Sequence, residues 1–225
     1  YCIINSGEYL LAVRLKSLTA FFVKGKTVLR RRGRNMNITV YLGANEGNDQ
    51  KLGTAVQELG QWIGVSGNAL IYGGSKTGLM GEIAKSVLEN NGKVIGVEPQ
   101  FFIDAGVQCN DLTQLIVTKD MAERKAKMIE LGDVFIAFPG GTGTLEEISE
   151  VMSKVSLDQL DSPCILYNLD GYYNSLKELL VHMIEKGLSS KERQQGIYFA
   201  ENLDQIKQII KAYYIAKDVS KKLCR

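Results

Sequence analysis

A glycine-rich segment, FPGGTGTLEEISE at residues 138–150, combines residue types that can bind an anion and place an acid beside it. Glycines let a phosphate approach the backbone closely, and a helix that begins after them offers N–H groups at the positive end of its dipole. Glu146 and Glu147 follow within one turn. Thr144 and Glu147 also fit the T-x-x-E capping box, in which the glutamate would only bond to the helix start. The local pattern alone leaves capping and catalysis equally open.

A second segment with chemical potential is MAERKAKM at residues 121–128, which has the composition of a helix. At helical spacing Arg124 and Met128 lie on one face, and Glu123 and Lys127 are placed to form an i,i+4 ion pair. Lys125 has the chemistry of the Schiff-base lysine of a pyridoxal enzyme, but no other feature of the sequence supports that cofactor. A charged helix face is usually only solvated, so this segment by itself identifies no site.

The elements that must position these segments alternate between short apolar runs, typical of strands, and longer amphipathic stretches, typical of helices. Strands are predicted at 38–43, 69–74, 93–97, 115–117, 134–138 and 164–168, and helices at 52–64, 79–92, 119–132, from about Thr144, 174–187 and 202–216. This alternation predicts an α/β fold of Rossmann type, a doubly wound parallel sheet with helices on both faces, with residues 36–225 in a single domain.

Glycines cluster after three of the predicted strands, where sheets of this kind bind their ligands. These residues are Gly43, Gly73, Gly74, Gly140, Gly141 and Gly143, with Thr142 and Thr144 adding hydroxyl donors. Because the carboxyl ends of parallel strands meet at one edge of the sheet, we expect the three loops to form one composite site. That setting favours a ligand-binding loop at 140–144 over a purely structural cap.

Residues 1–35 carry eight Lys or Arg side chains and one acid, which leaves 19 basic and 24 acidic residues in the rest of the chain. The body is therefore mildly acidic, and we expect no nucleic-acid partner. We expect residues 1–35 to be a basic leader, either disordered or absent from a native chain that starts at Met36.

Four scattered cysteines and the single His182 predict no metal site and a cytoplasmic compartment. No apolar run is long enough to predict a membrane span.

Taken together, YGG…GLMGE, ERK and PGGTGTLEE resemble, in order and spacing, the LOG (Lonely Guy) family of cytokinin riboside 5′-monophosphate phosphoribohydrolases, often mislabelled lysine decarboxylases. The resemblance runs from Ile38 to the last helix. It implies a Rossmann-like homodimer, without a cofactor, that hydrolyses the N-glycosidic bond of an adenine-type nucleoside 5′-monophosphate to free base and ribose 5-phosphate. Arg124 and Glu147 match the family's catalytic pair. Lys125 and the loop from Gly140 to Glu146 match its nucleotide-binding positions, and Ser153 joins the expected substrate-binding residues.

Departures from the family pattern concentrate where the base should lie. Ser75 replaces a glycine of YGGG, Ala122 replaces the histidine before ERK, and Gly106 stands where the family has a base-side glutamate. The base therefore stays open between adenine and an N6-modified adenine. The alternative function is a non-catalytic nucleotide-binding or sensing protein of the same fold. We further expect the apolar helix at 79–91 to supply the dimer interface, and we interpret Tyr172 and Tyr173 as packing groups.

Overall fold

The computed structural model describes residues 35–223, so the predicted leader lies, except for its last residue, outside the described part of the chain. In chain order the elements are β1 (Asn37–Tyr41), α1 (Gln50–Val65), β2 (Ala69–Tyr72), α2 (Gly78–Glu89), β3 (Lys93–Pro99), α3 (Gln100–Asp104), β4 (Gln114–Thr118), α4 (Met121–Leu131), β5 (Val134–Ala137), α5 (Thr142–Ser156), β6 (Cys164–Tyr167), η1 (Leu169–Gly171), α6 (Asn174–Glu185), β7 (Ile197–Ala200) and α7 (Leu203–Leu223). The predicted strands and helices are confirmed, with ends that differ by a few residues except at α7, which is predicted to end at residue 216 and runs to Leu223.

Within the described residues, seven strands form one sheet in the order β4-β3-β2-β1-β5-β6-β7, and all neighbouring strands are parallel. The predicted doubly wound, Rossmann-like fold is confirmed. From β1 the chain moves outward through β2, β3 and β4, and then returns to the other side of β1 with β5. Sheets of this type open a ligand crevice beyond the carboxyl ends of the strands at such a reversal. The fold therefore places the crevice beside the loops that follow β1 and β5.

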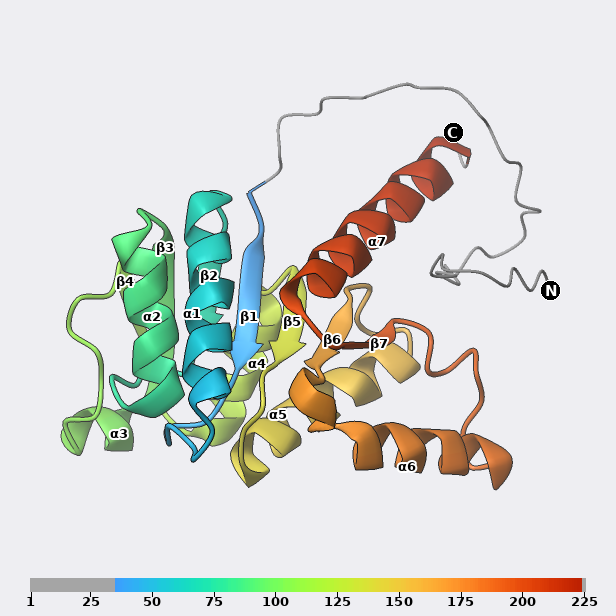
Figure 1. Cartoon of the computed structure of the whole chain (residues 1–225), viewed down its shortest axis with the longest axis horizontal. Helices are drawn as coiled ribbons and strands as arrows, with labels where there is room; N and C mark the ends of the chain where they lie inside the picture. The colour runs from blue at the N-terminus through green and yellow to red at the C-terminus, as the bar shows by residue number, and fades with distance from the viewer. Residues whose placement is uncertain (1–34, 224–225) are drawn as a thin grey trace.

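Helices cover the two faces of the sheet in separate layers (Figure 1). One hydrophobic core lies between the sheet and α1, α2 and α7, and contains Val56, Ile83 and Ile206. The second core lies between the sheet and α4 and α5, and contains Met128 and Ile148. Every residue of β2, β5 and β6 is buried between these layers, which explains their uninterrupted apolar sequences.

The apolar face of the helix at 79–91, observed as α2, is packed inside the protomer. Its apolar side chains Leu79, Ile83 and Val87 are at most 3% exposed. It approaches α1 closely at Gly60, where an added Cβ would lie 2.8 Å from the Cβ of Ser86. The apolar face of this helix is therefore covered by α1 and the sheet, so any role of the helix in a dimer interface would fall to its other face, and that role stays a prediction.

The sequence patterns predict neither the short helix α3 nor the edge strand β7. β7 has only four residues, IYFA, and follows Gly196, whose φ of +97° marks a sharp turn. Isolated apolar runs of this length are consistent with a strand or with part of a helix, so periodicity does not distinguish them. Along residues 35–223 no helix combines the length and the apolar character needed to cross a bilayer.

Candidate active site

Helix α4 begins at Met121 after its N-cap Asp120, and the side chains of Asp120 and Glu123 both bond to the backbone at the helix start. Asp120 Oδ1 accepts a hydrogen bond from Glu123 N at 2.8 Å, and Glu123 Oε2 accepts one from Lys119 N at 2.8 Å. The predicted Glu123–Lys127 ion pair is therefore wrong: Glu123 caps the helix, and Lys127 pairs with Glu130 at 2.9 Å. This cap fixes where α4 begins. Arg124, the residue after Glu123, then lies on the face of α4 that is turned toward the sheet.

Arg124 joins the elements that meet at the rim of the sheet. It is 7% exposed, donates from Nε to the carbonyl of Val97 at 2.9 Å, and donates from Nη1 to Glu147 Oε1 at 2.8 Å. The guanidinium fits only because residue 73 lacks a side chain. An ideal Cβ on Gly73 would lie 2.2 Å from Arg124 Nη2. Gly73, expected to approach a ligand, is thus placed against the arginine.

Glu147 faces this arginine and does not cap its own helix. α5 begins at Thr142 with Gly141 as its N-cap, so Thr144 is the third helical residue and not the cap that a T-x-x-E box requires. Glu147 is 7% exposed and bonds to Arg124 instead. Burial raises the pKa of Glu147 above its usual value, and the guanidinium of Arg124 offsets part of that rise. The capping interpretation is wrong, and the carboxylate is held at the rim.

The N-terminus of α5 is open to solvent. Gly141, Thr142 and Gly143 are exposed, and no side chain caps the helix. A Cβ added to Gly141 or Gly143 would meet nothing within 4 Å, whereas one on Gly140 would lie 2.3 Å from Thr144 Oγ1 and 3.2 Å from the backbone N of Gly43. The loops after β1 and β5 are therefore packed together, as predicted. The first N–H groups of α5 have no partner within the helix and form a seat for an anion.

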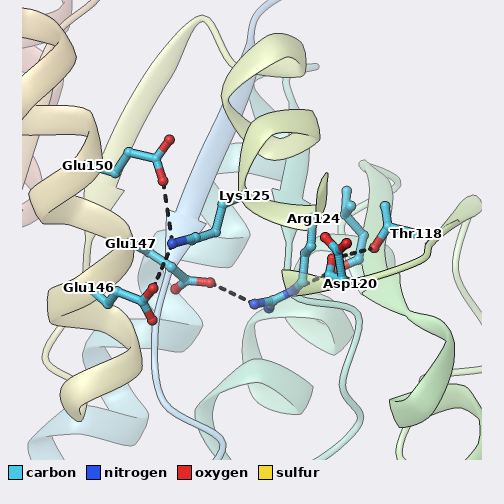
Figure 2. Close-up of polar contacts among 8 residues, drawn as sticks. Thr118, Asp120, Arg124, Lys125, Glu146, Glu147 and Glu150 are labelled. Atoms are coloured by element: carbon cyan, nitrogen blue, oxygen red, sulfur yellow. Dashed lines mark hydrogen bonds and ion pairs between the residues drawn. The ribbon is translucent and has the colours of Figure 1, made fainter. Parts of the chain in front are cut away.

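Lys125 lies beside the buried pair but makes its own contacts. Its Nζ is 2.6 Å from Glu146 Oε1 and 3.5 Å from Glu150 Oε2, as Figure 2 shows. The hydrogen bond to Glu146 raises the pKa of Lys125, with desolvation opposing. The two ERK side chains that face α5 thus have different partners: Arg124 binds the buried Glu147, and Lys125 binds the more exposed Glu146 (Figure 2).

Two expected site residues lie apart from this constellation. Gly74 has a φ of +90°, and an added Cβ would lie 3.1 Å from Glu98 Oε2, so the position needs glycine for its backbone and its packing. Ser153 is exposed and stands six residues after Glu147 on α5, about 9 Å further along the helix and on another face. The structure does not bring Ser153 to the rim, and its role in substrate binding stays a prediction.

Sequence reasoning missed Glu98, an acid at the carboxyl end of β3. The residue is 1% exposed, and its Oε2 has no hydrogen-bond partner among the described residues. Burial raises the pKa of Glu98 to about 7, and the charge of Arg124 acts in the opposite direction. The available signal was an acid near the end of the strand KVIGVEP, in which every other residue after Lys93 is uncharged.

Comparison with known proteins identifies relatives of the chain in sequence and in fold. A family model described as possible lysine decarboxylase matches residues 80–210. The cytokinin riboside 5′-monophosphate phosphoribohydrolase of Rhodococcoides fascians is 37% identical over 169 residues, which span 75% of this chain and 85% of that protein. The enzyme of the same description named LOG5, from Arabidopsis thaliana, is 33% identical over 187 residues, spanning 83% and 82%.

Among solved structures, the molybdenum cofactor binding protein of Rippkaea orientalis is similar, with a TM-score of 0.62 over 80% of this chain and 97% of that one. The molybdenum cofactor carrier protein of Chlamydomonas reinhardtii is similar with a TM-score of 0.57, over 79% and 99% of the two chains. At 23% and 21% sequence identity, these similarities show a shared fold and nothing about the ligand.

Proposed function

The chain belongs to the LOG family of cytokinin riboside 5′-monophosphate phosphoribohydrolases, and from this premise we propose that it hydrolyses the N-glycosidic bond of a nucleoside 5′-monophosphate. The products are the free base and ribose 5-phosphate. The observation that carries the proposal is the buried ion pair of Arg124 and Glu147, at 2.8 Å, held at the rim beside the open N-terminus of α5. This arrangement offers a carboxylate for the ribose and an anion seat for the phosphate.

The phosphate would bind at the start of α5. The exposed glycines Gly141 and Gly143 leave room for its oxygens to approach the backbone, and Thr142 adds an exposed residue with a hydroxyl donor. The helix dipole favours a negative charge there. Lys125 pairs with Glu146, the fifth residue of α5. A nucleoside without the phosphate would lose these interactions and bind weakly.

The carboxylate of Glu147 would act on the ribose. Cleavage of the bond between C1′ and the base nitrogen passes through an oxocarbenium-like state, which a fixed negative charge stabilises. Water supplies the oxygen of the new C1′–O bond, and Glu147 is suited to accept a proton from that water, while the departing base nitrogen takes up a proton. Arg124 holds the carboxylate in place and favours its charged form despite burial.

The contacts of Lys125 do not support a decarboxylase. A Schiff-base lysine must lose its proton to act as a nucleophile, which requires a lowered pKa. Lys125 instead has a raised pKa because Glu146 and Glu150 surround its ammonium group. Lys125 is therefore placed as the charged partner of two carboxylates and not as a nucleophile.

We propose an adenine-type nucleotide, either AMP or an N6-modified form, as the substrate.

We also propose a cytoplasmic homodimer, in line with the family, whose interface uses surfaces other than the apolar face of α2. Sedimentation or light scattering of the purified protein would measure the assembly, and a monomer at micromolar concentration would refute the dimer.

The decisive experiment incubates the protein with AMP, other nucleoside monophosphates and isopentenyl-AMP, and measures free base and ribose 5-phosphate. Glu147→Gln keeps the size of the side chain and removes its charge, so we expect base release to fall by roughly 100-fold or more. Glu130→Gln makes the same change at the exposed end of α4 and should not alter the rate. Base release by Glu147→Gln at the wild-type rate would refute the assigned role. Tight binding without release from any nucleotide would favour the non-catalytic alternative.

A further inference from the structure

The loop between β5 and α5 is held by two tyrosine hydroxyls from the segment after β6. Tyr173 donates its O–H to the carbonyl of Phe138 at 2.9 Å, and Tyr172 donates its O–H to the carbonyl of Gly140. The two rings pack edge to face, with centroids 4.9 Å apart. Tyr173 is 6% exposed, but Tyr172 is 54% exposed. The interpretation of both as packing groups therefore explains Tyr173 better than Tyr172.

The turn that carries Tyr172 is held in a strained conformation by several contacts. Asp170 and Gly171 have φ values of +48° and +79°. Asp is one of the few non-glycine residues that tolerate this left-handed region, and contacts from its surroundings help to hold it there. Here the buried Asn168 accepts a hydrogen bond from Tyr173 N at 2.6 Å, and Asp170 pairs with Lys51 of α1 at 2.6 Å. The turn thus presents the Tyr172 hydroxyl at a defined place.

The acceptor of that hydroxyl determines what the contact does. A peptide unit is planar and trans, so the C=O of Gly140 and the N–H of Gly141 point in opposite directions as one rigid group. A peptide flanked by two glycines turns over easily, because neither residue has a Cβ that restricts it. The hydrogen bond from Tyr172 therefore fixes the Gly141 N–H on the side of the loop away from the tyrosine.

The neighbouring contact has no such consequence. The carbonyl that accepts from Tyr173 belongs to Phe138, and the next residue is Pro139, which has no N–H. Holding this peptide stabilises the start of the loop but orients no donor. Of the two hydroxyl contacts, only the one made by Tyr172 can prepare the loop for an anion.

Resting on the proposed function, we propose that Tyr172 is a positioning residue that holds the Gly140–Gly141 peptide, so that the Gly141 N–H joins the N–H groups of α5 in binding the substrate's 5′-phosphate. Gly141 is exposed, and nothing lies within 4 Å of an added Cβ, so a ligand can reach its backbone. Phosphate contacts persist from the bound substrate to the transition state, so the effect belongs to KM and to phosphate affinity and leaves kcat unchanged.

The variant Tyr172→Phe deletes the hydroxyl and keeps the ring. We expect the Kd of ribose 5-phosphate and the KM of the nucleotide to rise roughly three- to ten-fold, which corresponds to one hydrogen bond, while kcat and Tm stay close to wild type. The matched control is Tyr213→Phe, which removes the same atom from α7, where it donates to Asp161. This control should leave phosphate affinity unchanged.

Amide NMR tests the orientation directly. Addition of inorganic phosphate should shift the Gly141 resonance of the wild-type protein and should shift it much less in Tyr172→Phe. Unchanged affinity and an unchanged Gly141 response in the variant would overturn the proposal, and so would a loss of kcat with an unchanged KM. A wild-type protein that binds neither phosphate nor ribose 5-phosphate would overturn it as well. A wild type that binds ribose 5-phosphate but releases no base refutes the proposed reaction alone, because the binding arms still test Tyr172.

Discussion

The fit between Gly73 and Arg124 provides a sharp test of how the rim is built. An added methyl group at Gly73 would lie 2.2 Å from Arg124 Nη2, with Met80 Sδ 2.9 Å away. Ordinary contact between such atoms needs about 3.5 Å, so roughly 1.3 Å must be found by movement. The guanidinium has to move, because Gly73 directly follows the buried strand β2 and its backbone is held by that strand.

The expected size of the effect follows from that displacement. Displacing the guanidinium by more than 1 Å should disturb the 2.8 Å hydrogen bond from Arg124 Nη1 to Glu147. A misplacement of about 1 Å in a catalytic group costs on the order of 100-fold in rate, and overpacking costs about 1–3 kcal/mol of stability. Because Arg124 holds down the pKa of Glu147, its displacement should also move the acid limb of the pH–rate profile to higher pH.

The assay compares kcat/KM for base release, the pH–rate profile and Tm in the wild type, Gly73→Ala and Gly53→Ala. The last variant makes the same change in α1, where nothing lies within 4 Å of the added methyl group, and it should be neutral or stabilising by up to about 1 kcal/mol. Rates are measured well below the lowest Tm, so that unfolding does not contribute. A Gly73→Ala protein with wild-type kcat/KM and an unshifted profile would refute the role of this glycine and weaken the assignment of Arg124.

Three further predictions use other parts of the site. Gly143→Ala meets no protein atom within 4 Å, so Tm should rise or stay level while nucleotide KM increases; an unchanged KM would contradict phosphate binding at α5. Because the pKa of Glu98 is raised to about 7 in the folded state from about 4.5 in the unfolded chain, stability should fall as pH rises between these values, by at most about 3 kcal/mol. Glu98→Gln should flatten that slope in denaturation curves at pH 5 to 8, and an unaltered slope would show that Glu98 does not titrate there. Lys125→Gln breaks a partly exposed pair with Glu146, so its stability cost should stay below about 1 kcal/mol in urea denaturation, and a larger loss would show the pair to be structural.

Much of the fold follows from local patterns in the sequence. Continuous apolar runs such as 134–138 predict buried strands, and amphipathic stretches between them predict helices. Parallel strands connected through helices bring all their carboxyl ends to one edge, so the glycine clusters after β1 and β5 were expected to meet there, and they do. The four-residue edge strand β7 escaped prediction because a run this short has no distinctive periodicity.

The ambiguity at Glu147 shows the limit of a local pattern. T-x-x-E at 144–147 satisfies a capping box, yet the glycine-rich loop allows α5 to begin earlier, with Gly141 as its N-cap. Where a helix starts depends on the backbone around it, and the cap of α5 is set by a loop packed against Gly43. Only the assembled loops decide that the glutamate points away from its own helix start.

The sequence by itself determined the order of the elements other than the short α3 and β7, the edge of the sheet that carries the site and the residue types gathered there. The tertiary structure alone decided which of them touch: Arg124 with Glu147, Lys125 with Glu146, and the Tyr172 hydroxyl with the loop after β5. The physical reason is distance along the chain. Periodicity and capping act over a few neighbouring residues, whereas these contacts join groups 21 to 32 residues apart, whose meeting depends on how strands and helices pack into one body.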